Sequence, residues 1–408
     1  MSQPNKKNRN IALGALAAAL LACGIGYKVI DKPDPVVVPP PVEEPAPLPE
    51  PEPEPGPITP SAFWIGTPGQ PGAVQWAPPA GLPPQREAWA NVYPWHRAGR
   101  DWEPGSLHAD VPDFNGNGEP DDYDSADPRC VRWNLNLFRE AGIDVAMGCW
   151  WGPHERESQT LPYLTTKAWE VWVDVCEQEG FAHVAELDDL PGADWGASQE
   201  VMHASLTRSM TYIEENWAHL PHYKQIDGRP VVVIYDRILD KLGGASESNA
   251  GPENRDVRAA MQALGPWMDD CYLVFMGVGG IQRVPTQTRR IGFGWYNIPF
   301  ANPVDTAAQY AYLAQRPDLD CFAWLFYAWD NTATRAGQRT GGFAWPADGP
   351  SIPFAVDQVV LALNGKPEVL VFPTDEFGER SSWLPTKERG RVYFDLMKQA
   401  IAAYKAAP

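Results

Sequence analysis

The amino-acid sequence predicts an α/β fold, a (β/α)8 barrel with enlarged loops, preceded by an N-terminal signal or anchor and a proline-rich linker. Two observations lead to this prediction. Eight apolar runs alternate with helix-like stretches over about 340 residues, and no low-complexity segment interrupts them. Aromatic and acidic residues recur where these runs end, which is typical of the barrel face that carries a site. We therefore expect three parts, which are residues 1–30, 31–60 and 61–408.

The first part, residues 1–30, is typical of an export or anchoring signal. Three basic residues among the first ten precede an apolar run, Ile11–Tyr27. Within this run, Leu20–Gly24 resembles the bacterial lipobox, in which Cys23 would carry the lipid. An uncleaved membrane span is the alternative, since the run's 17 residues are just enough to cross a bilayer. In both cases the basic flank predicts an exported, membrane-anchored body, either periplasmic or at the cell surface.

Residues 31–60 are typical of a linker. Thirteen of these thirty residues are proline, and most of the others are Val and Glu. Such a composition cannot pack a core, and it biases the chain toward extended polyproline II. At about 3.1 Å per residue the spacer would reach up to ~90 Å, so we expect it to hold the following domain away from a membrane.

Composition excludes one class of partner. The chain has 408 residues, a net charge of −19 and a pI near 4.8, and no basic patch stands out that could neutralise the phosphates of a nucleic acid. The 18 Trp residues suit either a large core or an aromatic-lined carbohydrate cleft. The six Cys residues show no metal-ligand or CxxC spacing, so we expect most of them to be buried free thiols.

The candidate barrel strands are short apolar runs that begin near the start of the globular part. They are Asn91–Trp95, Val145–Trp151, Ala182–Leu187, Val231–Asp236, Tyr272–Val278, Ile291–Ile298, Cys321–Trp329 and Val369–Phe372. The expected helices are Pro128–Ala141, Thr165–Glu179, Gln199–Ala218, Arg255–Leu264, Pro303–Ala314, Phe354–Leu363 and Lys387–Ala406. A doubly wound open sheet would show the same alternation, but no Gly-rich phosphate loop follows the first run. The barrel is therefore preferred.

The C-terminal ends of barrel strands meet on one face, where the chemistry of such folds is located. Aromatic and polar residues occur at seven of the eight predicted ends. The candidate substrate-binding residues among them are Tyr93, Trp95, His96, Trp150, Trp151, Glu155, Glu186, Asp188, Tyr235, Asp236, Tyr296, Trp329, Asp330 and Arg335. Aromatic rings stack on sugar rings and carboxylates bind hydroxyl groups, so this set favours a carbohydrate cleft.

The last apolar run, Val369–Phe372, is followed at once by an acidic segment that contains Glu376 and Glu379. Residues three apart in a helical or turn-like backbone share one face, with Cβ atoms roughly 5–6 Å apart. Two carboxylates at about this separation are what hydrolysis of a glycosidic bond requires. A solvated loop would explain an isolated pair of this kind, but the polar residues at the other strand ends favour a catalytic pair.

Six motifs, taken in order, resemble the family 99 glycoside hydrolases and their bacterial relatives from polysaccharide gene clusters, some of which are described as glycosyltransferases. The motifs are Tyr93–Trp95, Tyr123–Pro128, Ala141–Gly152, Asp227–Asp236, Trp329–Arg335 and Thr374–Arg380. The match spans roughly Asn91 to the C-terminus. The resemblance implies a (β/α)8 barrel and retaining, endo-acting cleavage of α-mannosides, with no cofactor for catalysis.

The resemblance also implies roles for the two glutamates. The family's NEWxEG segment falls on Asp375–Arg380, where Asp375, Phe377 and Arg380 replace Asn, Trp and Gly. By analogy with the family, Glu376 would deprotonate the sugar 2-hydroxyl, whose oxygen displaces the leaving group to give a 1,2-anhydro sugar. Glu379 would be the general acid.

A separate motif, Asp113–Asp124, matches the D-x-[DN]-x-[DN]-G pattern of calcium loops, with Gly118 in the sixth place. The candidate ligands are Asp113, Asn115, Asn117, Glu119, Asp121 and Asp124. We expect a structural Ca²⁺ here, and an Asp/Asn/Gly-rich loop without an ion is the alternative.

Together these observations predict an exported, membrane-tethered glycoside hydrolase that cleaves an α-linked, mannan-like polysaccharide or glycan. A non-catalytic surface barrel that binds polysaccharide is one alternative. A glycosyltransferase of envelope glycan assembly is another, although such an enzyme normally needs a nucleotide- or lipid-linked donor, and the sequence shows no phosphate-binding loop.

Overall fold

The computed structural model describes residues 63–65, 69, 73–77, 86–98, 107–153, 161–245, 256–276, 284–297, 303–325, 329–330, 344–345, 352–377 and 380–406. The expected signal or anchor and the linker, residues 1–60, lie outside the described residues. None of the described helices is long and apolar enough to cross a membrane.

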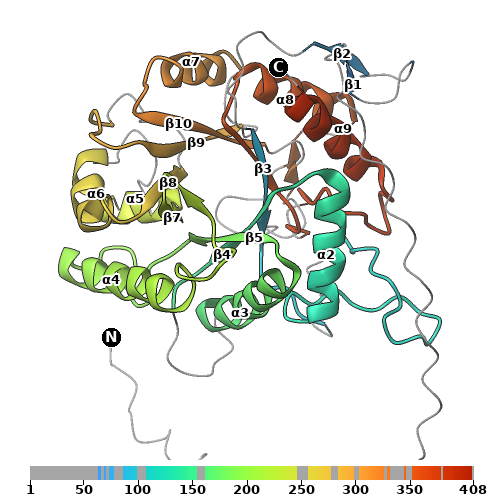
Figure 1. The fold of residues 1–408 in the computed structure, drawn as a ribbon, viewed down its shortest axis with the longest axis horizontal. Helices are drawn as coiled ribbons and strands as arrows, with labels where there is room; N and C mark the ends of the chain where they lie inside the picture. Colours follow the sequence, from blue (N-terminus) through green and yellow to red (C-terminus); the bar gives the residue numbers. More distant parts are fainter. Residues whose placement is uncertain are drawn as a thin grey trace, which may run out of the picture. The chain divides into compact units, whose positions relative to one another are not determined.

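Eight parallel strands close into a barrel, and each of the eight predicted strands corresponds to one of them (Figure 1). They are β3 (Glu87–Val92), β4 (Val145–Trp150), β5 (Ala182–Leu187), β7 (Arg229–Ile234), β8 (Tyr272–Met276), β9 (Ile291–Asn297), β10 (Leu319–Leu325) and β13 (Val369–Pro373). Neighbouring strands pair in sequence order, and β13 pairs in parallel with β3 to close the ring. The predicted (β/α)8 barrel is therefore confirmed.

The helices surround the ring of strands (Figure 1). They are α2 (Pro128–Ala141), α3 (Leu161–Glu179), α4 (Gln199–Asn216), α5 (Asp236–Leu242), α6 (Val257–Leu264), α7 (Pro303–Leu313), α8 (Ile352–Asn364) and α9 (Val392–Ala406), with a 3-10 turn η2 (Gly265–Trp267) after α6. The bounds of α2 agree with the prediction because its end signals are strong. Asp127 caps the first turn through its side chain, and Gly142 ends the helix in the left-handed conformation with φ 81°.

Several predicted element boundaries were wrong, among them the starts of the first strand and of the last helix. The first strand begins at Glu87, not Asn91. A charged residue is unexpected in a buried strand, but the Glu87 carboxylate is paired with Lys224 at 2.5 Å, so the strand can include it. Tyr93 and Trp95 therefore lie beyond the strand, in a turn closed by a 2.9 Å hydrogen bond between their backbones. The last helix begins at Val392, not Lys387, because residues 386–390 form a turn.

Short strands complete the described part of the chain. The hairpin of β1 (Phe63–Ile65) and β2 (Val74–Trp76) packs beside α8, where the Trp76 indole donates to Asn364 at 3.0 Å. A second hairpin joins β6 (Gln225–Ile226) to β7 through Asp227 and Gly228, whose φ values of 53° and 71° are those of a type I′ turn. The strands β11 (Trp329–Asp330) and β12 (Ala344–Trp345) pair with each other.

The interior of the barrel is filled by side chains, as its size requires. Gly292 and Gly294 in β9 leave room for the rings of Phe322 and Trp324 in β10, which would collide with a Cβ atom at either position. At the N-terminal end, a cavity of about 610 Å³ is lined by charged residues that include the Glu87–Lys224 pair. The described cysteines are free thiols, as expected, and all but Cys271 are buried.

Candidate active site

The loop that follows β13 carries Glu376 into the C-terminal mouth of the barrel. Its first residue, Thr374, continues the pairing with β3 by donating to the Asn91 carbonyl at 2.8 Å. The loop then folds back on itself, since Ser381 donates to the Glu376 carbonyl at 3.2 Å and the Ser382 hydroxyl donates to the Thr374 carbonyl at 2.7 Å. Glu376 is half-buried. Glu379 lies outside the described residues, so the distance between the two carboxylates stays a prediction.

Tyr93 lies at the centre of this mouth. Burial raises the pKa of its hydroxyl well above the usual value, and the charges of Glu186 and Glu376 raise it further. Tyr235 adds to the same effect. These residues follow or end different strands of the ring, β3, β5, β13 and β7, so the structure brings together four of the predicted strand ends. The Tyr93 ring also contacts that of Trp95, with centroids 4.9 Å apart.

Glu186 points into the barrel from β5 and is almost completely buried. Burial raises the pKa of its carboxyl well above the usual value, and nearby Asp188 adds to this, so the native site favours the protonated form of the group. Within the described part of the chain, its Oε2 atom and both polar side-chain atoms of buried Asn91 have no hydrogen-bond partner of good geometry, although a contact with the Asn91 side chain lowers the pKa of Glu186. Because buried polar atoms are nearly always paired, these three atoms indicate a place where a polar ligand or water completes the site.

Charged residues from β5 and α5 form one wall of the mouth. Burial raises the pKa of Asp188 to about 6, although the charge of Arg237 opposes the shift. Arg237 lies 3.4 Å from Asp188 and 3.5 Å from Asp189, and its guanidinium stacks 5.0 Å from the ring centroid of Trp151. Sequence reasoning missed Arg237, Asn91 and the helix α5. The available signal for Arg237 was its basic side chain directly after Asp236, the predicted end of the strand.

The aromatic residues divide between the mouth and the core. Trp151 is half-buried in the mouth, edge-on to Trp95 with ring centroids 6.5 Å apart. The preceding residue, Trp150, does not line the mouth, because successive side chains of a strand point to opposite faces. Its indole donates to Thr166 of α3 at 2.8 Å and packs 4.9 Å from the ring of Trp217.

The remaining predicted residues have mixed outcomes. His96 is half-buried behind the mouth against Phe377, with centroids 5.2 Å apart, and burial lowers its pKa to about 3, so the ring is neutral. Asp236 begins α5, and its charge raises the pKa values of Glu186 and Tyr235. Only the backbone is described for Tyr296, Trp329 and Asp330. Glu155 and Arg335 lie outside the described residues.

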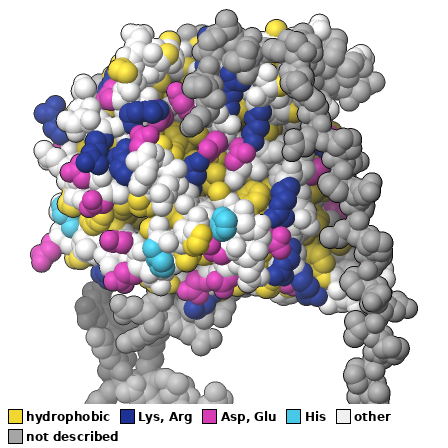
Figure 2. Space-filling model, in the orientation of Figure 1, with side chains coloured by type: hydrophobic (Ala, Val, Ile, Leu, Met, Phe, Trp, Pro, Cys, Tyr) yellow, Lys and Arg dark blue, Asp and Glu magenta, His cyan; other side chains and the backbone are white. Residues whose placement is uncertain are grey.

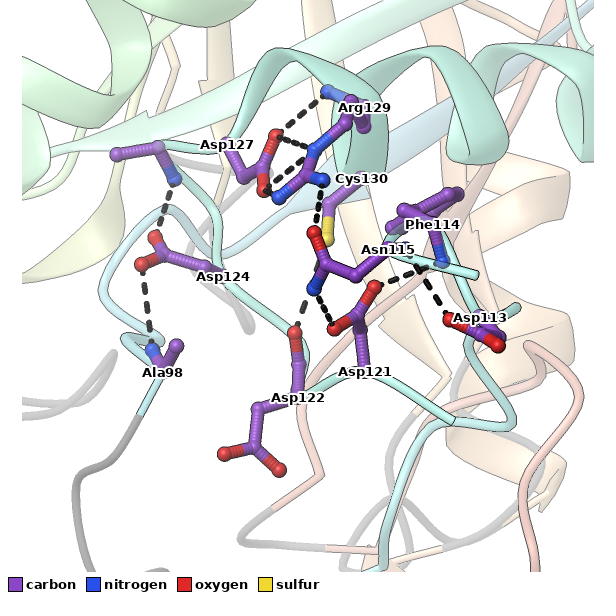
Figure 3. Close-up of polar contacts among 11 residues, drawn as sticks. Ala98, Asp113, Phe114, Asn115, Asp121, Asp122, Asp124, Asp127, Arg129 and Cys130 are labelled. Carbon is purple, nitrogen blue, oxygen red and sulfur yellow. Dashed lines mark hydrogen bonds and ion pairs between the residues drawn. The ribbon is translucent and has the colours of Figure 1, made fainter. Parts of the chain in front are cut away.

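The calcium-like loop has the backbone of such a motif, but its side chains are turned to other partners (Figure 3). Gly118 has the positive φ of 86° that the sixth position requires, and its N–H donates to the Asp113 carboxylate at 2.6 Å. Asp121 accepts the Phe114 N–H at 2.7 Å, and Asp124 accepts the Ala126 N–H at 2.8 Å.

The fit of these side chains to an ion is poor as they stand. Asn115 directs its amide oxygen to Arg129 at 2.8 Å and its amide nitrogen to Asp121. Over the described part of the chain, no group of three or more His, Cys, Asp or Glu side chains is placed to hold a metal ion. Calcium binding would therefore require these side chains to turn inward, and it stays a prediction.

Charged side chains of both signs are spread over the face seen in Figure 2. There, acidic and basic side chains alternate with apolar ones, and neither charge forms a continuous patch.

Comparison with known proteins identifies solved structures with a similar fold. No sequence family and no curated protein matches the chain. Similar solved structures include the GH99 endo-alpha-mannosidase from Bacteroides thetaiotaomicron in complex with bis-tris propane, at 14% identity and a TM-score of 0.52, covering 78% of this chain and 98% of that one. Another is a glycoside hydrolase-like protein, at 11% identity and a TM-score of 0.51, covering 79% and 96%. The resemblance in fold to a family 99 glycoside hydrolase is thus confirmed.

Proposed function

We propose that this protein is a glycoside hydrolase that cleaves an α-linked, mannan-like polysaccharide or glycan inside its chain, with Glu376 and Glu379 as the catalytic pair. The observation that carries the proposal is the position of Glu376 in the mouth, beside Tyr93 and the buried Glu186, whose pKa is raised by burial. The choice of substrate class is supported by the likeness of the barrel to an endo-alpha-mannosidase.

In the proposed reaction the configuration at the anomeric carbon is retained over two steps. Glu376 takes the proton of the sugar 2-hydroxyl while O2 attacks C1, and the bond from C1 to the leaving oxygen breaks as Glu379 protonates that oxygen. Water then attacks C1 of the anhydro sugar, giving its proton to Glu379, and Glu376 returns its proton to O2. Each carboxyl thus ends in its starting state, and two inversions at C1 restore the configuration.

The described residues of the mouth suit the other demands of this reaction. The protonated form of Glu186, which burial favours, can donate a hydrogen bond to a sugar hydroxyl, and the Asn91 amide can both donate and accept. Trp95 and Trp151 offer partly exposed rings for stacking. Among the described residues, Glu186 Oε2 and the Asn91 amide have no hydrogen-bond partner of good geometry, so a bound sugar could satisfy these atoms without displacing such a bond.

To test this, the full-length protein is incubated with a panel of α-mannan, α-glucan and β-linked oligosaccharides, and the products are analysed. We expect cleavage of an α-linked substrate, reduced about 10²- to 10⁴-fold in Glu376→Gln and Glu379→Gln. The matched control is Glu214→Gln, on an exposed position of α4, which should stay within twofold.

Three outcomes would contradict the proposal. Tight glycan binding without turnover would support a binding barrel, and glycan extension that depends on an activated donor would support a glycosyltransferase. Turnover within a few-fold of wild type in both glutamine variants would mean that the pair is not catalytic.

We also propose that the protein is exported and tethered to a membrane through its N-terminal segment. The described chain enters the barrel on the face opposite the mouth, because the β1–β2 hairpin contacts Asn364 at the C-terminal end of α8. Arg86, just before β3, donates to the Tyr404 carbonyl near the end of α9 at 3.3 Å.

A further inference from the structure

Asp375, directly before Glu376, takes no part in the proposed reaction, yet its carboxylate is completely buried. Its Oδ1 atom accepts the backbone N–H of Tyr93 at 2.6 Å, and its Oδ2 atom accepts the hydroxyl of Tyr123 at 2.8 Å. Within the described part of the chain, no Lys, Arg or His forms an ion pair with it. A buried carboxylate without a cation is costly, so its two hydrogen bonds call for a functional reason.

The direction of these hydrogen bonds shows why a carboxylate is needed. The amide nitrogen of Asn134 in α2 donates to the Tyr123 hydroxyl oxygen at 3.0 Å. That oxygen is therefore an acceptor toward Asn134, and its own proton is directed to Asp375. Both oxygens of Asp375 consequently face donors, and an asparagine at this position would turn its NH2 group against one of them.

The same contacts connect three segments that are far apart in the sequence. Tyr93 follows β3 and places its ring in the mouth, and Tyr123 lies before α2, where Asn134 holds it. Glu376 is the next residue in the chain after Asp375, and the Phe377 N–H donates to the Asp375 carbonyl at 2.8 Å. Tyr93 and Trp95 form the aromatic wall of the mouth. A movement of the Asp375 side chain would therefore displace both this wall and the proposed base, Glu376.

We propose that Asp375 is a positioning residue: its ionised carboxylate, held by Tyr93 and Tyr123, fixes Glu376 relative to the aromatic wall of the mouth. The expected effect on turnover rests on the proposed function, whereas the effect on local structure does not.

If the ionised form of Asp375 positions Glu376, turnover should depend on pH through the ionisation of Asp375, whereas a residue that only stabilises the fold would not show this dependence. Burial raises its pKa to about 7, and the hydrogen bonds from Tyr93 and Tyr123 oppose this shift. The titratable groups that face it are the hydroxyl of Tyr123, the His96 ring behind the mouth, and Glu376 on its own loop. His96 is neutral and Tyr123 is protonated near pH 7, so neither of these two groups changes charge there.

The first test measures local structure without activity. Amide hydrogen exchange is followed by mass spectrometry at pH 8 in the full-length wild type, Asp375→Asn and Tyr123→Phe. The control is Tyr223→Phe, which removes an equally buried hydroxyl bond, 2.8 Å to the Val231 carbonyl, away from the mouth. We expect faster exchange around Tyr93 and in residues 374–382 for the first two variants only. Unchanged exchange there would overturn the proposal, whatever the activity.

The second test measures kcat and KM against pH on the substrate found in the glycan panel. We expect kcat to fall about 10- to 100-fold in Asp375→Asn with KM within threefold, since misplacement of the reacting groups slows the chemical step. In Tyr123→Phe the acidic limb of the profile of kcat against pH should move to higher pH. The hydrogen bond lost in this variant stabilises the ionised form of Asp375, so its loss raises the pKa of that residue. The positioning role would be overturned if the acidic limb of the Tyr123→Phe profile stayed in place. It would also be overturned if kcat fell no more in Asp375→Asn than in Tyr223→Phe.

The two tests separate the two proposals. If amide exchange is faster in Asp375→Asn and Tyr123→Phe but the wild type cleaves no glycan, the positioning role of Asp375 stands and the proposed hydrolase activity is contradicted.

Discussion

Trp150 and Trp151 are adjacent in sequence but have different environments, and this difference can be tested one residue at a time. Trp150 is completely buried between the barrel and its helices, so Trp150→Ala should destabilise the fold by about 3–5 kcal/mol. Trp151 is half-buried in the mouth, so Trp151→Ala should weaken glycan binding about threefold to tenfold with little loss of stability. Chemical denaturation and calorimetric titration would distinguish them. The reverse pattern would place Trp150 in the site.

The sequence predicted the residue types of the mouth better than their orientations. Tyr93, Glu186, Asp188 and Glu376 could be chosen because acidic and aromatic residues at strand ends have few structural uses. Trp150 could not be excluded, since a shift of one residue along a strand reverses the face to which a side chain points. Asn91 could not be recognised at all, because its proposed role depends on its burial beside Glu186 in three dimensions.

Glu186 should make the stability of the protein depend on pH. The native state raises its pKa, so it retains the proton that the unfolded chain has lost above about pH 4.3. The unfolding free energy should therefore fall as pH rises from about 4.5, by at most about 1.4 kcal/mol per pH unit from this group. Glu186→Gln, which is neutral at every pH, should flatten this slope and equal the wild type near pH 4.

Urea denaturation between pH 4 and 8 measures this slope. The exposed Glu214→Gln serves as the control that leaves the slope unchanged. A slope that is identical in Glu186→Gln and the wild type would mean that Glu186 is ionised in the native state, contrary to its proposed role as a hydrogen-bond donor.

At the scale of elements, strands were predicted well because buried parallel strands are continuous apolar runs. The strand β5 was found with the correct bounds for this reason. The helix α5 was missed because it has only seven residues and follows β7 after a single residue, so no periodicity could develop. Arg237, which bridges Asp188 and Asp189, was missed together with the helix that carries it.

The loop Asp113–Asp124 is the element whose role most needs experiment. Millimolar Ca²⁺ should raise the melting temperature relative to EDTA if the ion binds the native state, by mass action. Asp113→Ala would remove the first ligand position, but it would also remove the acceptor of the Gly118 N–H at 2.6 Å. Asp113→Asn keeps an acceptor while lowering the charge, so it should reduce the calcium-dependent shift more than the melting temperature in EDTA. Equal melting temperatures in Ca²⁺ and EDTA would exclude the ion.

At the scale of the whole molecule, closure of the barrel followed from the count of eight runs, whereas the relation of the two glutamates did not. Thr374 and Ser382 determine how the loop after β13 folds back, through bonds to backbone groups that no sequence pattern marks. The sequence could therefore place Glu376 at a strand end, but not beside Tyr93.

The location of the protein is a prediction about the whole chain. A basic segment, the apolar run Ile11–Tyr27 and a proline-rich linker should direct the barrel out of the cytoplasm and hold it at a membrane. We expect the full-length protein in the membrane fraction, sensitive to protease added outside the cytoplasm, and released in soluble form when residues 1–30 are replaced by a cleavable secretion signal. Recovery of the unmodified protein from the soluble cytoplasm would contradict this.

Cys23→Ser then distinguishes the two anchors. If Leu20–Gly24 is a lipobox, the substitution should abolish labelling with a fatty-acid analogue, because the thiol is the site of attachment. If the run simply spans the bilayer, serine at this position should leave the membrane fraction unchanged, since one hydroxyl in a helix of 17 largely apolar residues can bond to the preceding turn. Cys130→Ser, which changes a buried thiol of the barrel, is the matched control for the chemistry of the substitution. Labelling that persists in Cys23→Ser but is lost in Cys130→Ser would place the lipid on the barrel and refute the lipobox.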